Sequence, residues 1–390
     1  MSTAPNNVRV RVTLNGTTMP YTQLEVEKAL DAFAHRFSFS IVGGDAESQP
    51  GGAVVISRGD EVLATGFINR ARVGLGSREY SVHFEGRSAT ADLVDSSATH
   101  KSGTWMNKSA LSIIADICEP FAIFVDTSQD PETLQAAAGD TFPRYSIEPG
   151  ESAFASIDRL CKARGLLPTT RADGALLLVR KIKGLDVLAV TSKGQRYVER
   201  SIILSHERAY DDSDIHSEYS SSIHIAAPQD ANTKASVEAV PSWKTTPRWR
   251  PLVVIPDAPL GPVALLNRLQ WESNVRKGRS ERFRFTVSGT GHNADESWLP
   301  GREYVLPDLL SQYRLLGKVS DNVDDPLPSS LLEKANIRVS SESATCDLEF
   351  VNPLAYSLES DTTVNVAGLT KSKTKPKLIV HRTKKRRQTK

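Results

Sequence analysis

Residues 142–181 constrain the fold of this chain most strongly, because three local signals agree there. A Pro-Gly pair at 149–150 breaks the chain, and Glu151 and Ser152 then supply an acidic and a capping residue for a helix. Apolar side chains recur at helical spacing up to Cys161, and Gly165 ends the pattern. The stretch therefore predicts a strand followed by a capped amphipathic helix.

A hairpin is predicted directly after this helix. Asp173-Gly174 is a strong two-residue turn signal between the apolar runs Leu166–Arg171 and Ala175–Lys181. The unit contains no histidine that could activate the Cys161 thiol, so we interpret Cys161 as a small core residue and not as a nucleophile.

The N-terminal region predicts short antiparallel strands. Val8–Leu14 alternates apolar and polar residues and is followed by the turn Asn15-Gly16. Further short strands are predicted at Leu24–Ala29, Phe37–Val42, Ala53–Ser57, Val62–Val73 and Arg78–Glu85. Many short strands joined by Gly, Asn and Asp turns favour a small antiparallel barrel or sandwich. Arg87–Thr99 is expected to be a crossing linker.

Helical patterns return in the middle of the chain. Ser109 is a capping candidate for a helix that Glu119-Pro120 closes, and Ala122–Val125 is expected to form a short strand. Asp130-Pro131 starts another short helix, which Gly139 ends. We predict a compact helix-and-strand domain from about residue 105 to residue 181.

A second strand-rich region begins after this domain. Alternation reappears in Ser201–Ser205 and Glu218–Ala226. Residues 228–262 contain seven prolines and predict a long extended excursion. Val263–Arg276 predicts a helix stopped by Gly278, and later strands are expected at Glu281–Ser288, Gln312–Val319, Ala335–Ser341 and Ala344–Val351.

Three quoted segments carry a family resemblance. They are the capped helix and hairpin with Gly150-Glu151-Ser152, Arg159-Leu160, Ala163–Leu166 and Gly174–Leu178; the turn and strand Asp60–Ile68 with its Thr-Gly-Phe; and Trp298-Leu299-Pro300-Gly301 leading to Val305. In this order they resemble phage baseplate hub proteins of the Mu type, and more distantly the late-control D proteins and the hub region of VgrG.

The resemblance implies a strand-rich α+β fold: two small antiparallel β-barrel domains that flank an α/β middle region and are discontinuous in sequence. The expected segments are a first barrel at 1–95, an α+β domain at 96–182, the start of the second strand-rich domain with its excursion at 183–262, a helix-strand segment returning to the α+β part at 263–292, closing strands at 293–360 and a basic tail at 361–390.

The function implied by the resemblance is that of a structural, non-enzymatic hub in the baseplate of a contractile tail. Three chains would form a ring that adapts a sixfold tail tube to a threefold central spike and that takes part in genome ejection. The implied partners are two further copies of the chain, a spike protein, a tail tube or tube-initiator protein and neighbouring baseplate proteins. DNA would be a partner only in transit, and no membrane insertion is expected. The location would be the virion, with assembly in the host cytoplasm.

Charge is distributed unevenly along the chain. Residues 371–390 hold ten Lys and Arg residues and no acid; subtracting them from the whole chain's +2 leaves residues 1–370 at −8. Such a tail is either disordered or ordered by contact with phosphates or with an acidic neighbouring subunit. The candidate docking residues are Leu378, Ile379, Val380, Lys384, Lys385, Arg386 and Arg387. A channel that DNA must pass should not have a basic wall, so we expect the tail to lie away from it.

No cofactor, metal or catalytic residue is predicted. The acidic run Asp211-Asp212-Ser213-Asp214 lacks the Gly and Glu of a calcium loop, and we interpret it as a solvated turn rather than a calcium site. A catalytic carboxylate pair of a glycosidase could be drawn from Glu296 or from the pair Glu148 and Glu151, but surface carboxylates are common and this hypothesis is not favoured. The three cysteines fit buried free thiols in a reducing compartment. No apolar run approaches membrane-spanning length, and no secretory signal is visible at the N-terminus.

The alternative functions differ in what they require. One is a nucleic-acid-binding protein that uses the basic tail, and another is a hub component of a type VI-like secretion spike. A glycan-cleaving or adhesin protein would need catalytic carboxylates or an aromatic groove that the sequence does not place.

Overall fold

The computed structural model describes residues 8–42, 50–75, 80–127, 131–139, 141–179, 196–223, 233–238, 248–255, 262–293, 295–307 and 330–356. The seven predicted tail residues, 378–380 and 384–387, lie outside these ranges, as does the strand expected at 312–319. The described residues form two compact units. The first holds those of 1–209 and 282–351, and the second those of 210–281 and 352–390.

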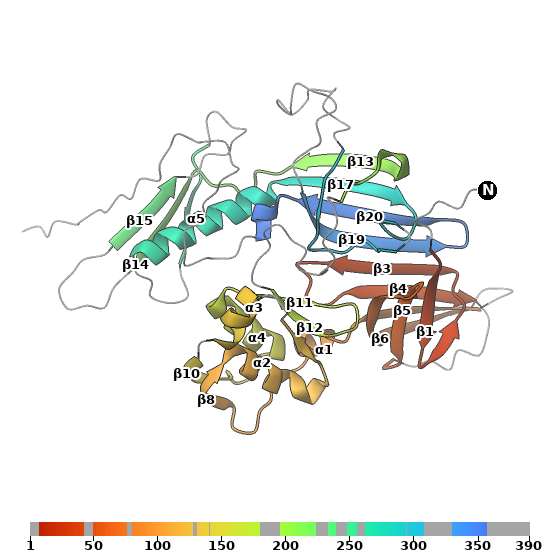
Figure 1. Ribbon diagram of the computed structural model, residues 1–390, viewed down its shortest axis with the longest axis horizontal. Helices are drawn as coiled ribbons and strands as arrows, with labels where there is room; N and C mark the ends of the chain where they lie inside the picture. The colour runs from red at the N-terminus through yellow and green to blue at the C-terminus, as the bar shows by residue number, and fades with distance from the viewer. Residues whose placement is uncertain are drawn as a thin grey trace, which may run out of the picture. The chain divides into compact units, whose positions relative to one another are not determined.

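A 12-stranded sheet dominates the first unit (Figure 1). Its N-terminal strands are β1 Val10–Leu14, β2 Thr17–Met19, β3 Gln23–Ala29, β4 Arg36–Val42, β5 Ala53–Arg58, β6 Glu61–Leu75 and β7 Tyr80–Ser88. Its later strands are β13 Ile203–Tyr210, β17 Glu281–Ser288, β18 Glu303–Tyr304, β19 Ser330–Ser340 and β20 Ala344–Val351. Among the described strands the order runs β13-β17-β20-β19-β3-β4-β7-β6-β5-β1-β2, with β18 paired to β19.

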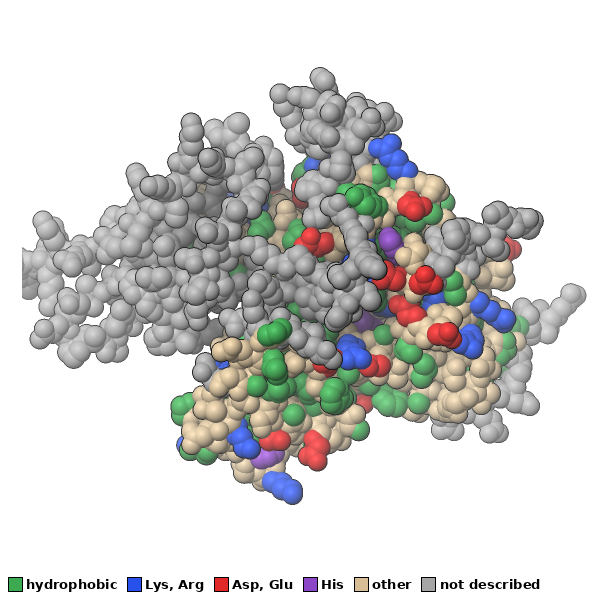
Figure 2. All heavy atoms as spheres, in the orientation of Figure 1, with side chains coloured by type: hydrophobic (Ala, Val, Ile, Leu, Met, Phe, Trp, Pro, Cys, Tyr) green, Lys and Arg blue, Asp and Glu red, His purple; other side chains and the backbone are tan. Residues whose placement is uncertain are grey.

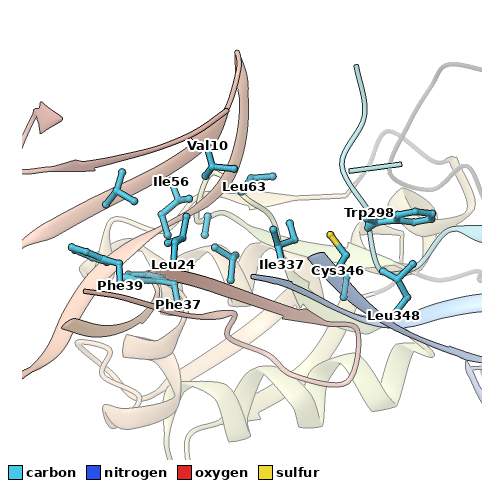
Figure 3. Packing of buried hydrophobic residues seen from close by; sticks show 14 of the residues in the cluster. Val10, Leu24, Phe37, Phe39, Ile56, Leu63, Trp298, Ile337, Cys346 and Leu348 are labelled. Atoms are coloured by element: carbon cyan, nitrogen blue, oxygen red, sulfur yellow. The ribbon is translucent and has the colours of Figure 1, made fainter. Parts of the chain in front are cut away.

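Strands from the two ends of the chain meet at β3 and β19. They pair antiparallel over seven residues, from Lys334 opposite Ala29 to Ser340 opposite Gln23. Alternation in each strand sends one set of side chains into a shared core. Figure 3 shows residues of both regions, such as Phe37, Leu24, Ile337 and Leu348, packed in this core.

Between these regions in the sequence lies a smaller α+β domain with a core of its own. Its elements are α1 Ala91–Asp95, β8 Thr104–Ser109, α2 Ala110–Cys118, β9 Val125–Asp126, α3 Pro131–Ala138, β10 Thr141–Ser146, α4 Ala153–Arg164, β11 Leu167–Thr170 and β12 Leu176–Val179. Strand β10 pairs with β8, and β12 lies between β11 and β9.

The caps of α4 follow the sequence prediction. The Ser152 hydroxyl accepts a hydrogen bond from the Ala155 amide at 3.1 Å, and Gly165 ends the helix at φ +60°, in the left-handed region. The hairpin is also confirmed, with Gly174 at φ +90° between β11 and β12. Cys161 is fully buried, as a core residue should be.

The second unit combines a helix with a three-stranded sheet. Its elements are β14 Glu218–Ile223, β15 Thr233–Glu238, β16 Pro251–Val253 and α5 Pro262–Arg279. Strand β14 pairs antiparallel with β15 and parallel with β16.

Four local predictions are wrong. The 228–262 excursion contains strands β15 and β16; Pro251 is tolerated because it begins an edge strand, where a missing N–H breaks no ladder bond. Gly278 lies inside α5, where a side chain would meet the Ala355 backbone at 2.2 Å. The linker at 87–99 contains α1, and the strand expected from Ala122 begins later because Ala122 is left-handed (φ +54°). The coarse prediction of a strand-rich α+β fold is confirmed.

Gly66 in β6 offers a test of how closely β6 approaches the backbone of β7. A Cβ atom there would lie 1.9 Å from the Arg87 carbonyl oxygen, so we expect Gly66→Ala to lower the free energy of unfolding by about 2 kcal/mol or more. In the control Gly74→Ala, on the same strand, the new Cβ would meet the Ser81 hydroxyl oxygen at 3.3 Å, and we expect a change within about 0.5 kcal/mol. Denaturant unfolding of both variants measures the difference; equal effects would contradict the close approach.

Candidate functional site

The carboxylates singled out in the sequence have structural partners. The Glu151 carboxylate accepts from the Glu148 amide at 2.9 Å and from Arg159 at 2.7 Å, which fastens the start of α4. The Asp211 carboxylate accepts from the Ser213 amide at 2.8 Å, which is the geometry of a turn. These contacts give the Glu151 and Asp211 carboxylates structural roles.

The cysteine thiols are buried and poorly suited to nucleophilic chemistry. Burial raises the pKa of Cys118 and of Cys346 to about 12, and it also raises the pKa of the Cys161 thiol. Within the described residues, no group of three or more His, Cys, Asp or Glu side chains is arranged to hold a metal ion. No described helix combines the length and apolarity needed to span a membrane.

A seam of buried charge joins the N-terminal strands to the loop after β17. Arg58, at the end of β5, is 2% exposed. Its Nε donates to the Thr290 hydroxyl at 3.1 Å, and its Nη2 donates to the Asn293 carbonyl. The Thr290 hydroxyl in turn donates to the Val8 carbonyl at 2.8 Å. Residues more than 230 positions apart are thus held by hydrogen bonds to one buried guanidinium.

Two carboxylates complete the seam. Glu61 lies 3.8 Å from Arg58 and accepts from the amide and hydroxyl of Ser297 at 2.9 and 2.7 Å. Glu296 lies between Arg196 at 3.5 Å and Arg302 at 3.2 Å. The buried guanidinium groups are therefore paired with carboxylates, as the cost of desolvating a charge requires.

Lys28 is the exception in this seam. Its side chain, on β3, is 1% exposed, and among the described residues its Nζ has no hydrogen-bond partner. Burial lowers the pKa of Lys28 to about 8; Glu61 opposes the shift, whereas Arg302 and Arg58 add to it. Lys28 shares the inward side of β3 with the buried Leu24 and Val26, as the alternation of that strand requires. Its burial is not predicted from the sequence, because lysine is rarely buried fully unless it is paired.

A charge-paired face covers the opposite side of the same sheet. The pairs run across strands: Glu207–Arg284 (3.4 Å), Arg284–Glu349 (3.7 Å), Arg282–Glu333 (3.2 Å), Lys334–Glu27 (2.6 Å), Arg338–Glu25 (3.4 Å), Arg338–Asp347 (2.5 Å), Arg70–Glu85 (3.4 Å) and Arg72–Glu85 (2.9 Å). Arg282 also pairs with Glu349, and Arg87 pairs with Asp95. On the face drawn in Figure 2, acidic and basic side chains lie interspersed.

Lys28 predicts a pH-dependent stability. Between pH 8 and 10.5 the unfolded lysine holds a proton that the folded lysine has released, so stability rises with pH across this window. Below it, the folded state carries the whole cost of the buried charge, about 3 kcal/mol. We expect Lys28→Met to be more stable than the unchanged chain near pH 7 and to lose that advantage by pH 10.5.

Thermal and denaturant unfolding at a series of pH values measures this difference. Lys334→Met serves as the matched control, because Lys334 lies on the neighbouring strand with 39% of its side chain exposed. A stability difference for Lys28→Met that stays constant from pH 8 to 10.5 would contradict the assignment.

The α+β domain matches a family of known proteins. Residues 90–180 match the model described as "Baseplate hub protein gp44-like, second domain". The baseplate hub protein gp44 of Escherichia phage Mu is 24% identical to this chain over 290 residues, which cover 72% of this chain and 73% of that protein.

Solved structures share the fold over nearly the whole chain. The 43 kDa tail protein of prophage MuSo2 from Shewanella oneidensis has a TM-score of 0.71 at 21% identity, covering 89% of this chain and 98% of that one. A tail protein from Neisseria meningitidis MC58 has a TM-score of 0.67 at 16% identity, with coverage of 90% and 99%. The c3393 protein of E. coli, a component of the type VI secretion system, has a TM-score of 0.52 at 12% identity, with coverage of 87% and 75%.

These similarities agree with one another and with the motifs quoted from the sequence. The predicted resemblance of this chain to baseplate hub proteins of the Mu type is therefore confirmed, with residues 90–180 matching their gp44-like second domain.

Proposed function

We propose that this chain is the structural baseplate hub of a contractile phage tail, and that it acts by assembly rather than by catalysis. The observation that carries the proposal is the gp44-like domain at residues 90–180, which lies in the sequence between strands of one continuous sheet. Similarity to phage Mu gp44 over 72% of the chain supports the same function for the whole protein.

We further propose that three copies form a ring, with two barrel-like halves from each chain. One half would be built from β1–β7 and the other from β13 and β17–β20, with the α+β domain between them in sequence. Two similar halves in each of three chains would present six related surfaces to a sixfold tube and three to a spike. The spike, the tube or tube initiator and the neighbouring baseplate proteins would be its partners in the virion, after assembly in the host cytoplasm.

The ring is tested by mass and by imaging. We expect native mass spectrometry of the purified protein to give a trimer of the 42.6 kDa chain, and negative-stain images to show a ring with a central hole. A monomer at all concentrations, together with a monomeric hub in assembled tails, would contradict the ring.

The basic tail is proposed to dock on a neighbouring tail protein, through Leu378–Val380 and the cluster Lys384–Arg387. Removing the tail distinguishes this role from that of a nucleic-acid-binding protein that uses the same residues. Truncation after Leu369 should leave the ring intact and weaken one contact with a tail protein. The loss relative to the intact chain should be larger at low salt than at high salt, because high salt already screens the charges of the intact tail.

Pull-down of tail proteins at 50 and 300 mM salt measures that contact. Replacing Lys384, Lys385, Arg386 and Arg387 by Gln should reproduce the loss, whereas the control with Lys371, Lys373, Lys375 and Lys377 replaced by Gln should retain binding. Failure of the truncated chain to form the ring would contradict this role. Tight DNA binding that disappears with the tail, while the body binds no tail protein, would support the nucleic-acid alternative.

A further inference from the structure

The buried seam holds more cations than carboxylates. Four of its cations have side chains that are at most 13% exposed: Lys28, Arg58, Arg196 and Arg302. Its carboxylates are Glu61 and Glu296, and the exposed Asp295 acts on Arg58 from the surface. Four cations and these three carboxylates leave a formal surplus of one positive charge, or of two when the exposed Asp295 is left out.

Two of the cations, Lys28 and Arg302, lie along the same edge of β19. Lys28 stands opposite Ala335 in the β3–β19 register, and the Leu332 amide donates to the Arg302 carbonyl at 2.9 Å. Strand β20 occupies the other edge of β19, so the end of β3 and the start of β18 share this edge. The charge of Arg302 also contributes to the lowered pKa of Lys28, as its proximity requires.

Each of these two cations has a buried donor that no other described residue engages. Lys28 Nζ and Arg302 Nε are both buried, and neither has a hydrogen-bond partner within the described ranges. The remaining neighbourhood is apolar: Trp298, Ile337 and Cys346 are fully buried in the same core (Figure 3). Burying such donors unbonded costs free energy, and burying an ammonium without a counter-charge costs more.

The charge surplus and the number of donors limit what could complete the seam. A water molecule would accept a hydrogen bond from Lys28 or Arg302 but would leave the surplus charge in place. Phosphate and sulfate have four oxygens each, which is more acceptors than these two buried side chains can satisfy. A halide carries one negative charge on one small atom, and it accepts hydrogen bonds from any direction.

We propose that Lys28 and Arg302 bind a small monovalent anion of the halide class inside the seam. The anion would be a structural ligand, which completes the contact of the N-terminal strands with residues 290–305. Because the two cations come together only in the folded chain, the anion stabilises the fold by mass action. This site is independent of the proposed hub function, since it rests on the burial, the donors and the charge of the seam alone.

Thermal unfolding of the full chain at pH 7 tests the site, with bromide as the probe. The comparison is sodium bromide against sodium gluconate, each at about 200 mM, because gluconate is too large for the seam and equal ionic strength keeps screening constant. We expect the unfolding midpoint to be about 2 °C or more higher in bromide. Lys28→Met should abolish this difference, whereas the control Lys334→Met, on the neighbouring strand with 39% of its side chain exposed, should retain it.

The same anion affects the stability expected for Lys28→Met. Bound halide offsets the cost of burying the Lys28 ammonium, so the advantage of this variant near pH 7 should be largest in halide-free buffer and should shrink as bromide is added. An equal response of the unchanged chain and Lys28→Met to bromide would overturn the site.

Anomalous X-ray scattering from bromide locates the anion in crystals of the unchanged chain, so it does not depend on whether Lys28→Met folds. We expect a buried bromide in contact with Lys28 Nζ and Arg302 Nε. Bromide found only at the surface would overturn the site. A buried bromide without any bromide-specific shift of the unfolding midpoint would mean binding at crystal concentration only, and it would overturn the structural role.

Discussion

The pairing of β3 with β19 is the constraint on which the rest of the first unit depends. It joins strands more than 300 residues apart into one sheet, and it places the N-terminal and C-terminal apolar side chains in one core. Bringing together two strands so far apart in the chain costs loop-closure entropy. The burial of apolar side chains over many strands must offset that cost. The α+β domain, whose contacts are local, has a separate core and does not depend on it in the same way.

Polar groups specify how that long-range pairing is made. Arg58 and Glu61 are satisfied only when the loop after β17 lies against β5 and β6, because Thr290, Asn293 and Ser297 provide their partners. A buried charge that loses its partner costs more free energy than the pair contributes when it is formed. Arrangements that leave these groups unpaired are therefore less stable. Lys28 is different: it is buried, burial lowers its pKa, and its Nζ has no hydrogen-bond partner in the part of the chain that the structure describes.

Charge is arranged in two different ways in this chain. On the sheet face, cations and carboxylates form ion pairs across strands, whereas the ten basic residues of 371–390 have no acid among them. A net charge of +2 for the whole chain conceals both arrangements. The two arrangements differ in their expected effect on a partner, because unpaired cations attract polyanions and acidic surfaces alike, whereas a cation beside a carboxylate is largely neutralised.

Local sequence pattern alone determined much of this protein. Ser152, Gly165 and the Asp173-Gly174 turn predict α4 and its hairpin, and strict alternation predicts β1, β3, β4 and β20, because caps, turns and period-two burial act over a few residues. Tertiary structure alone decided that β3 meets β19, that Gly278 remains helical against Ala355, and that Lys28 points into a charged seam. Those outcomes depend on contacts between residues tens to hundreds of positions apart, which no local pattern records.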